Sequence, residues 1–519
     1  MNITSSRRGF LRGMAGASLL GAGGCAVFGG RGKIRLAVVG VGGKGYSDWT
    51  PMLTTGLAEV VAFCDVDRGT YRSCMVRAAK DGFGDLSKVP FFTDYRKLLD
   101  NCGLLGVEAM TVSTPDHAHA PVAIQAMKMG IHVYVQKPLV RTLWELDYFN
   151  RTAKENGVVV QMGNQGSSLD SMRRCTEILQ SGVLGDVTEV HVWTNRPVWP
   201  QGKVLADYIK GRGAKGDPIP LDLDWNAFLA TAKARPYLGK FPDNLGPFHN
   251  DWKIAPNVYH AFNWRGSIDF GAGAFGDMAC HTMNLAFRGL ELGAVSDAEC
   301  TMIEGASDLI FPVKSVVKLT YKARVAKFGG NRGRKLPAVT LFWYDGDEKP
   351  KAELMPKWAA KNGGKVPDTG CYVIGTKGAV LMQDDYGGKC AIALKGDAAF
   401  VDVFEHEAAK EVAREIPFCP GSAPQSEKES SVEMKGFAEG HYAEFLTAIR
   451  GEGPVYEQTN SRCFSDVEYC IPQMEGILVG VLAQQVPGKH VWNSAAQKFA
   501  GNDAANNLLK PYVRQGWAF

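Results

Sequence analysis

At 519 residues, of which 45% are hydrophobic and 22% charged, the chain is that of a globular protein with two or three domains. The net charge of +4 includes four arginines near the N-terminus, so the remainder is close to neutral and we expect no nucleic-acid partner. No apolar run reaches the roughly 18 residues that a membrane span requires, so we expect no transmembrane segment.

Residues 1–31 resemble a twin-arginine signal peptide. The stretch Ser6–Arg12 (SRRGFLR) carries the paired arginines, and a weakly apolar run rich in Ala and Gly follows from Gly13 to Phe28. A basic unstructured tail is the alternative. Because the twin-arginine route exports folded proteins, we predict a periplasmic or otherwise exported protein that carries its cofactor with it. Cys25 follows a Gly-Gly pair as in a lipoprotein cleavage site but lacks the usual preceding Leu, which leaves a lipid anchor at Cys25 as an open alternative.

A dinucleotide-binding motif follows the first predicted strand. Lys33–Val39 (KIRLAVV) is a short apolar run, and the next six residues (GVGGKG) have the spacing G-x-G-x-x-G. Glycines in such a loop permit a tight turn and let a pyrophosphate approach the backbone at a helix N-terminus. The predicted cofactor-binding residues of this loop are Gly40, Gly42, Gly43 and Gly45.

An acidic residue stands where the adenosine ribose is expected. A second predicted strand, Glu59–Cys64, ends in Asp65, twenty residues after Gly45. An aspartate at this place repels a 2′-phosphate, so we expect NAD as the cofactor. Arg68 nearby keeps NADP open as the less favoured cofactor.

Strand and helix patterns alternate through this part of the chain. Strands are predicted at 106–113, 132–135 and 158–162, and helices at 118–129 and 142–156. This alternation predicts an α/β fold with a doubly wound, mostly parallel sheet, which is a Rossmann domain over residues 32–165. A substrate and oligomerisation domain is expected over residues 166–519.

Polar residues follow one strand at the edge where open α/β sheets bind ligands. Pro115 and His119 lie in the stretch Thr114–His119 (TPDHAH), directly after the strand at 106–113. Two histidines near an aspartate invite a metal site, but a third ligand is missing, so we predict no metal. We expect Pro115 and His119 to line the cofactor cleft.

Three further residues are candidates for proton transfer. Lys137 follows the next strand, where partial desolvation lowers the pKa of a lysine toward values useful in catalysis. Asp277 and His281 are four residues apart in a predicted helix, so they share one face, and the carboxylate is placed to orient the imidazole as a general base. Taken singly, Lys137 also fits a simple turn and His281 a core position.

Together these residues resemble the Gfo/Idh/MocA family, which includes sugar and inositol oxidoreductases, over about residues 33–300. The resemblance implies that the glycines hold the pyrophosphate, and that Lys137 contacts both the nicotinamide ribose and the substrate. It implies that His281, paired with Asp277, is the acid/base on a sugar hydroxyl. It also implies a C-terminal α+β domain with an open, mostly antiparallel sheet that covers the nicotinamide, and a homo-oligomer. Gln136 stands where the family has Glu, and the loss of this charge should weaken the hold of Lys137 on a proton.

The remainder of the chain carries strand patterns and a Trp-rich insertion. Strand-like stretches occur at 187–195, 314–323, 339–344 and 370–382. A loop-rich insertion at about 197–260 has tryptophans suited to stacking on sugars, although each one taken singly is expected to pack the insertion. A helical run is predicted from His441 to about Arg450. The candidate substrate contacts are Arg196, Trp199, His260 and Arg265.

The predicted location bears on the reaction. Outside the cytoplasm little free NAD(H) is available, so a plain dehydrogenase would stop after one turnover. We therefore predict an NAD(P)-dependent oxidoreductase that acts on a carbohydrate and recycles a tightly bound nicotinamide in place.

Two alternatives remain for the function. In redox-assisted glycoside hydrolysis, oxidation acidifies the neighbouring C–H, His281 or Lys137 removes the proton, the substituent leaves, water adds and the hydride returns. The other alternative is a secreted, non-catalytic sugar-binding protein that retains NAD, for which Gln136 is the only hint.

Overall fold

The computed structural model describes residues 32–240, 257–420 and 434–519. The predicted export signal and Cys25 lie outside the described residues. Residues 34–519 form one compact unit. Within the described ranges, no helix is both long enough and apolar enough to cross a membrane.

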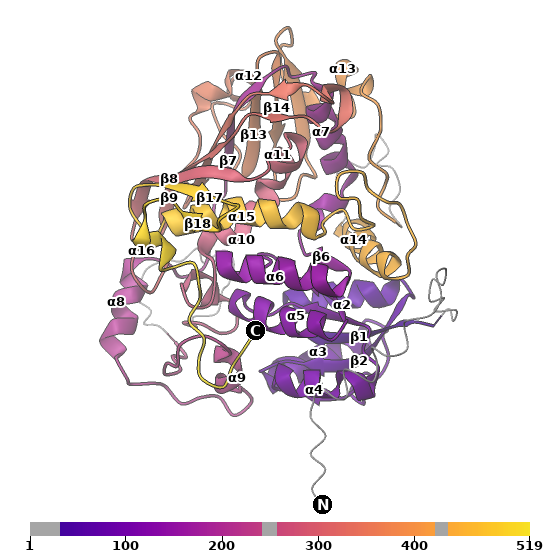
Figure 1. The fold of residues 1–519 in the computed structure, drawn as a ribbon, viewed down its shortest axis with the longest axis vertical. Coiled ribbons are helices and arrows are strands. Elements are labelled where there is room, and N and C mark those ends of the chain that lie inside the picture. Colours follow the sequence, from indigo (N-terminus) through magenta and orange to yellow (C-terminus); the bar gives the residue numbers. More distant parts are fainter. Residues whose placement is uncertain (1–31, 241–256, 421–433) are drawn as a thin grey trace, which may run out of the picture. The chain divides into compact units, whose positions relative to one another are not determined.

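A six-stranded parallel sheet forms the N-terminal part of this unit (Figure 1). Its strand order is β3-β2-β1-β4-β5-β6, and Leu36 of β1 pairs with Val60 of β2 and with Ala109 of β4. All but one of the residues of β1 are buried, as expected for a parallel sheet covered on both faces. This confirms the predicted doubly wound α/β fold. The strands are β1 (Ile34–Val39), β2 (Ala58–Cys64), β3 (Phe91–Phe92), β4 (Ala109–Val112), β5 (His132–Val135) and β6 (Val160–Met162), and the helices are α2 (Lys44–Thr54), α3 (Arg68–Lys80), α4 (Tyr95–Leu105), α5 (Asp116–Lys128) and α6 (Leu143–Asn156).

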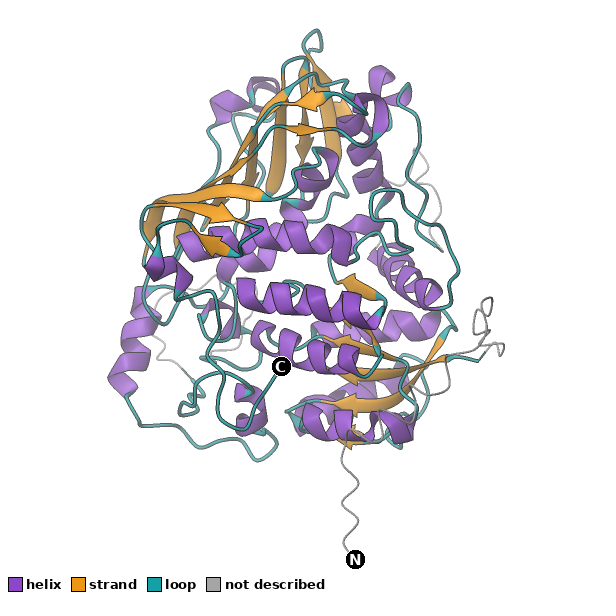
Figure 2. Ribbon diagram, viewed as in Figure 1, coloured by secondary structure: helices purple, strands orange, loops and turns teal. Residues whose placement is uncertain are grey.

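A ten-stranded sheet forms the second part, drawn as the larger group of orange arrows in Figure 2. Its order is β16-β15-β14-β13-β7-β12-β9-β8-β17-β18, and all neighbours are antiparallel except β7 and β12. Every second residue of β9 is buried, which is typical of a sheet with one face toward the core. This confirms the predicted open, mostly antiparallel sheet. The strands are β7 (Val187–Trp193), β8 (Val295–Glu304), β9 (Lys314–Tyr321), β12 (Val339–Asp345), β13 (Gly370–Gly375), β14 (Gly378–Met382), β15 (Cys390–Leu394), β16 (Val401–Asp402), β17 (Lys489–Asn493) and β18 (Lys498–Phe499), and a separate pair is formed by β10 (Arg324–Val325) and β11 (Lys335–Leu336).

Two predicted elements differ from the structure. Residues 370–382 are predicted as one strand, but they form the antiparallel hairpin β13–β14 with Thr376 and Lys377 at its turn. The apolar pattern continues across this short turn, so the sequence shows no break. The helix predicted to open at His441 begins earlier, because α14 spans Met434–Ile449.

Two helices lie in the described residues of the insertion predicted at about 197–260. They are α8 (Lys203–Arg212) and α9 (Trp225–Leu229), and the other described residues of the insertion are mainly loops and turns. The Trp225 ring stacks on Phe228 with centroids 4.8 Å apart and on Tyr259 at 5.9 Å. Trp225 therefore packs the insertion. The other helices are α7 (Asp170–Ser181), α10 (Gly273–Thr282), α11 (Asn284–Gly289), α12 (Pro356–Lys361), α13 (Glu407–Lys410), α15 (Val467–Ala483) and α16 (Asp503–Asn506).

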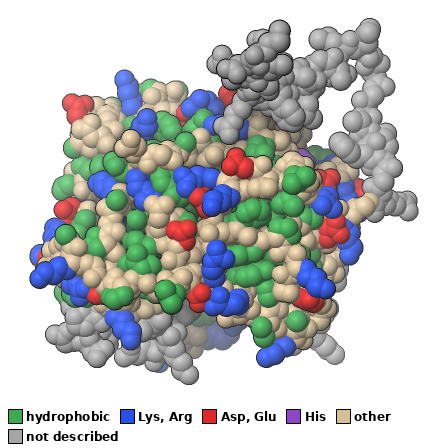
Figure 3. All heavy atoms as spheres, turned by 90° about the horizontal axis from the view of Figure 1, so that it is seen from below, with side chains coloured by type: hydrophobic (Ala, Val, Ile, Leu, Met, Phe, Trp, Pro, Cys, Tyr) green, Lys and Arg blue, Asp and Glu red, His purple; other side chains and the backbone are tan. Residues whose placement is uncertain are grey.

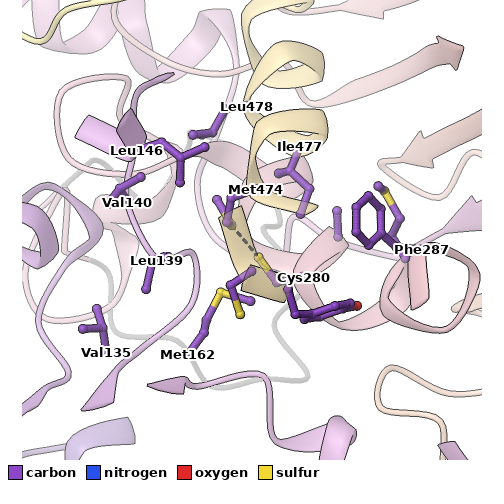
Figure 4. Close-up of a cluster of buried hydrophobic side chains, with 14 of the residues drawn as sticks. Val135, Leu139, Val140, Leu146, Met162, Cys280, Phe287, Met474, Ile477 and Leu478 are labelled. Carbon is purple, nitrogen blue, oxygen red and sulfur yellow. Dashed lines mark hydrogen bonds between the residues drawn. The ribbon is translucent and has the colours of Figure 1, made fainter. Parts of the chain in front are cut away.

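Helix α15 joins the two sheets. It lies between α6 of the first part and the strands of the second (Figure 1). Figure 4 shows Met474 and Ile477 of α15 beside Met162 of β6 and Cys280 of α10, with Cys280 Sγ 3.5 Å from Met474 Sδ. One continuous hydrophobic cluster therefore includes residues of both sheets.

The face drawn in Figure 3 carries Lys and Arg side chains interspersed with Asp and Glu side chains and with apolar groups. Neither sign of charge forms a continuous field on this face. The mixture is in keeping with the small net charge of the chain.

The close approach of α15 to α10 yields a stability prediction. A Cβ on Gly480 would lie 2.3 Å from the Phe275 ring of α10. Gly480→Ala should therefore lower the free energy of unfolding in urea by about 1–3 kcal/mol through overpacking. The control is Gly103→Ala in α4, where nothing lies within 4 Å of the added Cβ. This control should gain about 0.4–1 kcal/mol from the reduced entropy of its unfolded chain, and a similar loss in both variants would contradict the packing argument.

Candidate active site

The glycine loop between β1 and α2 forms one wall of a cavity. Gly40 has a φ of +83°, and a Cβ on it would lie 2.5 Å from the carbonyl oxygen of Ser113. A Cβ on Gly45 would lie 1.9 Å from the carbonyl oxygen of Gly40. A side chain at either position would displace the loop, so both glycines are required for this backbone path. The loop leads directly into α2, whose N-terminal end suits an anion.

The cavity has a volume of about 640 Å³ and is bounded by the first sheet, the insertion and the β14–β15 loop. The predicted site residues in its lining are Gly40, Gly42, Gly43, Asp65, Pro115, Lys137, His260, Arg265 and His281. The predicted site residues outside its lining are Gly45, His119, Arg196, Trp199 and Asp277.

Asp65 at the end of β2 is held by two backbone groups. Val41 N donates to Asp65 Oδ2 at 2.8 Å, and Asp67 N donates to Oδ1 at 3.0 Å. Each carboxylate oxygen accepts more than one hydrogen bond, so lone pairs remain for a ligand. Asp65 therefore lines the cavity in a fixed orientation suited to ribose hydroxyls.

Asp116 provides an independent sign that the cavity takes a ligand. It is 2% exposed, and neither carboxyl oxygen has a hydrogen-bond partner among the described residues. Burial, and then the nearby charge of Asp277, raises the pKa of Asp116 well above its usual value. A neutral carboxyl that lines a cavity without a protein partner fits a ligand that supplies one. Together with the glycine loop and Asp65, this donor set fits a dinucleotide.

His119 lies behind the cavity wall rather than in its lining, which corrects the expectation from the sequence. It is fully buried, and its ring nitrogens lie 2.8 Å from the carbonyl oxygen of Pro138 and 2.9 Å from that of Thr114. Burial lowers the pKa of His119 to about 4, so the neutral ring donates to one of these carbonyls. His119 thus lies between the end of β4 and the turn after β5 and is hydrogen-bonded to one of them.

The neighbouring histidine also faces the backbone. His117 Nε2 lies 2.8 Å from the carbonyl oxygen of Phe228. Within the described ranges, no group of three His, Cys, Asp or Glu side chains is arranged to hold a metal ion.

Asp277 in α10 is shared by two cations. Lys137 Nζ donates to Asp277 Oδ1 and to its carbonyl oxygen, both at 2.9 Å, and Arg265 Nε donates to Oδ1 at 3.2 Å. Burial alone would raise the pKa of Asp277, but the charges of Lys137 and Arg265 lower it to about 2. The carboxylate is therefore ionised at neutral pH, and it supplies Lys137 with the negative charge that Gln136 lacks.

His281 lies one turn further along α10 and lines the cavity. Contrary to the expectation from their spacing, no hydrogen bond joins Asp277 to His281 in the described part of the chain, because Asp277 is engaged with the two cations. The His281 ring instead packs edge-on against Tyr386, with centroids 4.6 Å apart. Burial, and then the charge of Lys137, lowers the pKa of His281 well below its usual value. The imidazole is thus neutral at physiological pH and able to accept a proton.

The candidate substrate contacts fall into two groups. Arg196 Nη2 donates to Asp385 Oδ2 at 3.0 Å, outside the cavity lining. Trp199 is 2% exposed and its Nε1 donates to Gln201 Oε1 at 2.8 Å, so its ring is not a surface for sugar stacking. The other two candidates, His260 and Arg265, do line the cavity.

Sequence reasoning missed several residues in and beside this cavity, namely Lys44, Asp48, Gln165 and Tyr386. Lys44 lies inside the glycine motif, between Gly43 and Gly45, and this position is the sequence signal that could have predicted it. Tyr386 lies in the loop between β14 and β15, where no motif marks it. Tyr442 of α14 also reaches this region, because its hydroxyl lies 3.2 Å from Lys44 Nζ.

Comparison with known proteins identifies the N-terminal part. Residues 34–164 match the model of the Gfo/Idh/MocA family, an oxidoreductase family with an NAD-binding Rossmann fold. Glycosyl hydrolase family 109 protein 2 of Akkermansia muciniphila is 29% identical over 160 residues, which cover 30% of this chain and 33% of that protein. Inositol 2-dehydrogenase 1 of Saccharopolyspora erythraea is 32% identical over 161 residues, which cover 30% of this chain and 44% of that protein. The chain thus matches less than half the length of these curated relatives.

A solved structure resembles the chain over a greater length. The inositol dehydrogenase homolog from Azotobacter vinelandii, complexed with NADH and myo-inositol, aligns with a TM-score of 0.53 at 17% identity, covering 89% of this chain and 98% of that one. This likeness shows a shared fold beyond residue 164. Residues 34–164 thus correspond to the NAD-binding Rossmann domain of the Gfo/Idh/MocA oxidoreductase family.

Proposed function

We propose that this protein is a sugar oxidoreductase that holds NAD in the cavity described above. The observation that carries the proposal is that the glycine loop, Lys137 and His281 line one cavity, although they lie far apart in the sequence. NAD bound there would accept hydride from a sugar carbon and return it. The inositol dehydrogenases among the relatives support a polyol or a sugar as the substrate.

The chain's own residues divide the work on the sugar hydroxyl. His281 would take the hydroxyl proton, because its imidazole is neutral and lines the cavity. Lys137 would donate a hydrogen bond to the same oxygen, which favours loss of the proton by stabilising negative charge there. Asp277 would keep Lys137 and Arg265 in place through its ionised carboxylate.

Contacts of the insertion support a cofactor that stays bound between turnovers. Arg68 N donates to the carbonyl oxygen of Asp222 at 2.9 Å, and Asp224 N donates to that of Val66 at 2.8 Å. His260 Nε2 lies 2.9 Å from Asp67 Oδ2. These bonds fasten the insertion to the segment directly after Asp65, so a dinucleotide lying against Asp65 would be released only when they part.

Redox-assisted glycoside hydrolysis is the second candidate. It is favoured by the relatives named as family 109 glycosyl hydrolases, one of which is 29% identical over 160 residues. In this reaction His281 or Lys137 would remove the C–H proton next to the oxidised carbon. Export by the twin-arginine route would suit either reaction, because the resident cofactor would be regenerated in each cycle.

The function is tested on protein purified without added NAD. Denaturation should release about one NAD per chain, and a sugar should reduce the cofactor in the intact protein. His281→Ala should slow that reduction by about 10²–10⁴-fold and leave the NAD content unchanged. Free sugar released from a glycoside without net reduction would favour the hydrolase, whereas NAD without any turnover would favour a binding protein. Turnover only with added NAD would contradict a resident cofactor.

The charge of Lys137 should be visible in the pH dependence of the rate. Because the pKa of His281 is lowered, its base form persists below the usual value of 6.5, and the acidic limb of kcat should lie below that pH. Lys137→Met removes a charge that lowers this pKa, so the acidic limb should move to higher pH, whatever the loss in maximal rate. Lys203→Met, which breaks an exposed ion pair with Asp207, is the control and should leave the limb in place.

The fastening of the insertion predicts the rate of cofactor release. His260→Ala removes the side-chain bond between the insertion and Asp67 and should raise the NAD dissociation rate by about tenfold, the effect of one charge-assisted hydrogen bond. His406→Ala is a matched control, because His406 Nε2 lies 2.8 Å from Asp397 Oδ2 outside the cavity lining. An equal change in both variants, measured by displacement of bound NAD, would argue against retention by the insertion.

A further inference from the structure

Asp48 of α2 is a fully buried carboxylate beside the cavity. Four side chains from different parts of the chain donate hydrogen bonds to it. The donors are Lys44 Nζ at 2.5 Å, Ser113 Oγ at 2.7 Å, Gln136 Nε2 at 3.0 Å and the Tyr442 hydroxyl at 2.5 Å. Lys44 opens α2, Ser113 follows β4, Gln136 follows β5 and Tyr442 belongs to α14. A buried carboxylate is tolerated when its lone pairs are used in this way.

The bond from Gln136 connects Asp48 to Lys137. Gln136 Nε2 donates to Asp48, while Gln136 Oε1 accepts from Lys137 N at 3.2 Å. An ionised carboxylate only accepts hydrogen bonds, so Asp48 holds the amide nitrogen and turns the amide oxygen toward Lys137. With the amide reversed, two oxygens would face each other and Lys137 N would lose its acceptor.

The bond from Lys44 holds another cation at the cavity, besides Lys137 and Arg265. Lys44 lines the cavity that contains His281, and its charge is among those that lower the pKa of His281. Because Asp48 accepts from Lys44 at 2.5 Å, the position of this ammonium depends on the carboxylate.

We propose that Asp48 is a positioning residue of the redox site: through Gln136 it fixes the turn that carries Lys137, and it holds Lys44 at the cavity wall. This proposal rests on the proposed function. The pair consists of one carboxylate and one amide in contact, so the two groups can be exchanged between positions 48 and 136 without a change in total charge. The exchange variant therefore tests whether the contact between a carboxylate and an amide matters, independently of which position carries which group.

The test is a double-mutant cycle of Asp48→Asn, Gln136→Glu and the exchange variant that carries both substitutions. Asp48→Asn leaves Lys44 without its counter-charge, and Gln136→Glu brings two carboxylates into contact. In each single variant, the sugar should reduce the bound NAD at least about tenfold more slowly than in the wild type, measured in a single turnover. The sugar concentration that gives half of the maximal rate should change less. The exchange variant should recover to within about threefold of the wild type.

Asp345→Asn is the matched control for the loss of a buried carboxylate. Asp345 is 1% exposed and accepts from Ser315 Oγ and Trp343 Nε1, both at 2.9 Å, outside the cavity lining. It should lower the unfolding midpoint without slowing reduction. Tyr442→Phe is the substitute test if the single charge variants do not fold, because it removes one donor to Asp48 without changing any charge. It should slow the reduction of NAD and leave the NAD content unchanged.

Two results would overturn the proposal: single variants no slower than Asp345→Asn, or an exchange variant whose loss equals the product of the two single losses. NAD dissociation rates are measured on the same four proteins, because Lys44 and Gln136 both line the cavity. If no sugar reduces the NAD bound to the wild type, the proposed function fails, and the mutant cycle is then evaluated from the NAD dissociation rates. A dissociation rate in the exchange variant that returns to the wild-type value would still support a positioning role for Asp48. A rate that does not return would overturn that role.

Discussion

Two cations donate to one oxygen of Asp277, and this shared carboxylate fixes the geometry of the whole site. Lys137 comes from the turn after β5, Arg265 from the segment that follows the insertion, and Asp277 from α10. Each buried charge costs several kcal/mol unless it is paired and hydrogen-bonded. None of the three segments can therefore move far from the others without leaving an unpaired charge in the interior.

Lys137 of this contact also acts on the neighbouring imidazole. Burial is the main cause that lowers the pKa of His281, and the charge of Lys137 adds to it, while the charge of Asp277 opposes it. Asp48 differs from Asp277, because its carboxylate accepts hydrogen bonds from one positive and three neutral side chains. The site thus contains a carboxylate that accepts several hydrogen bonds, Asp48, behind the glycine loop, and an imidazole that can accept a proton, His281, beside Lys137.

The sequence predicted those parts of the site whose residues lie close together along the chain. The glycine loop and Asp65 lie within one strand–helix–strand unit, so their meeting follows from local geometry. The partner of Asp277 could not be predicted in this way, because Lys137 is 140 residues distant and helical periodicity carries no information about it. Trp199 was expected at the sugar, but its exposure depends on how the insertion folds over it. Asp48 has no sequence signal, since a carboxylate in a helix is usually solvated.

Helix α15 packs into the hydrophobic cluster of both sheets, so the two parts share one interior. Enzymes whose halves meet across a thin interface can swing shut on a substrate, but a shared core resists any hinge of that kind. The shared interior therefore predicts that the walls of the cavity keep their spacing when a ligand enters. A ligand of such a site is selected by its fit to a cavity that is already formed, rather than by its ability to trigger a closing movement.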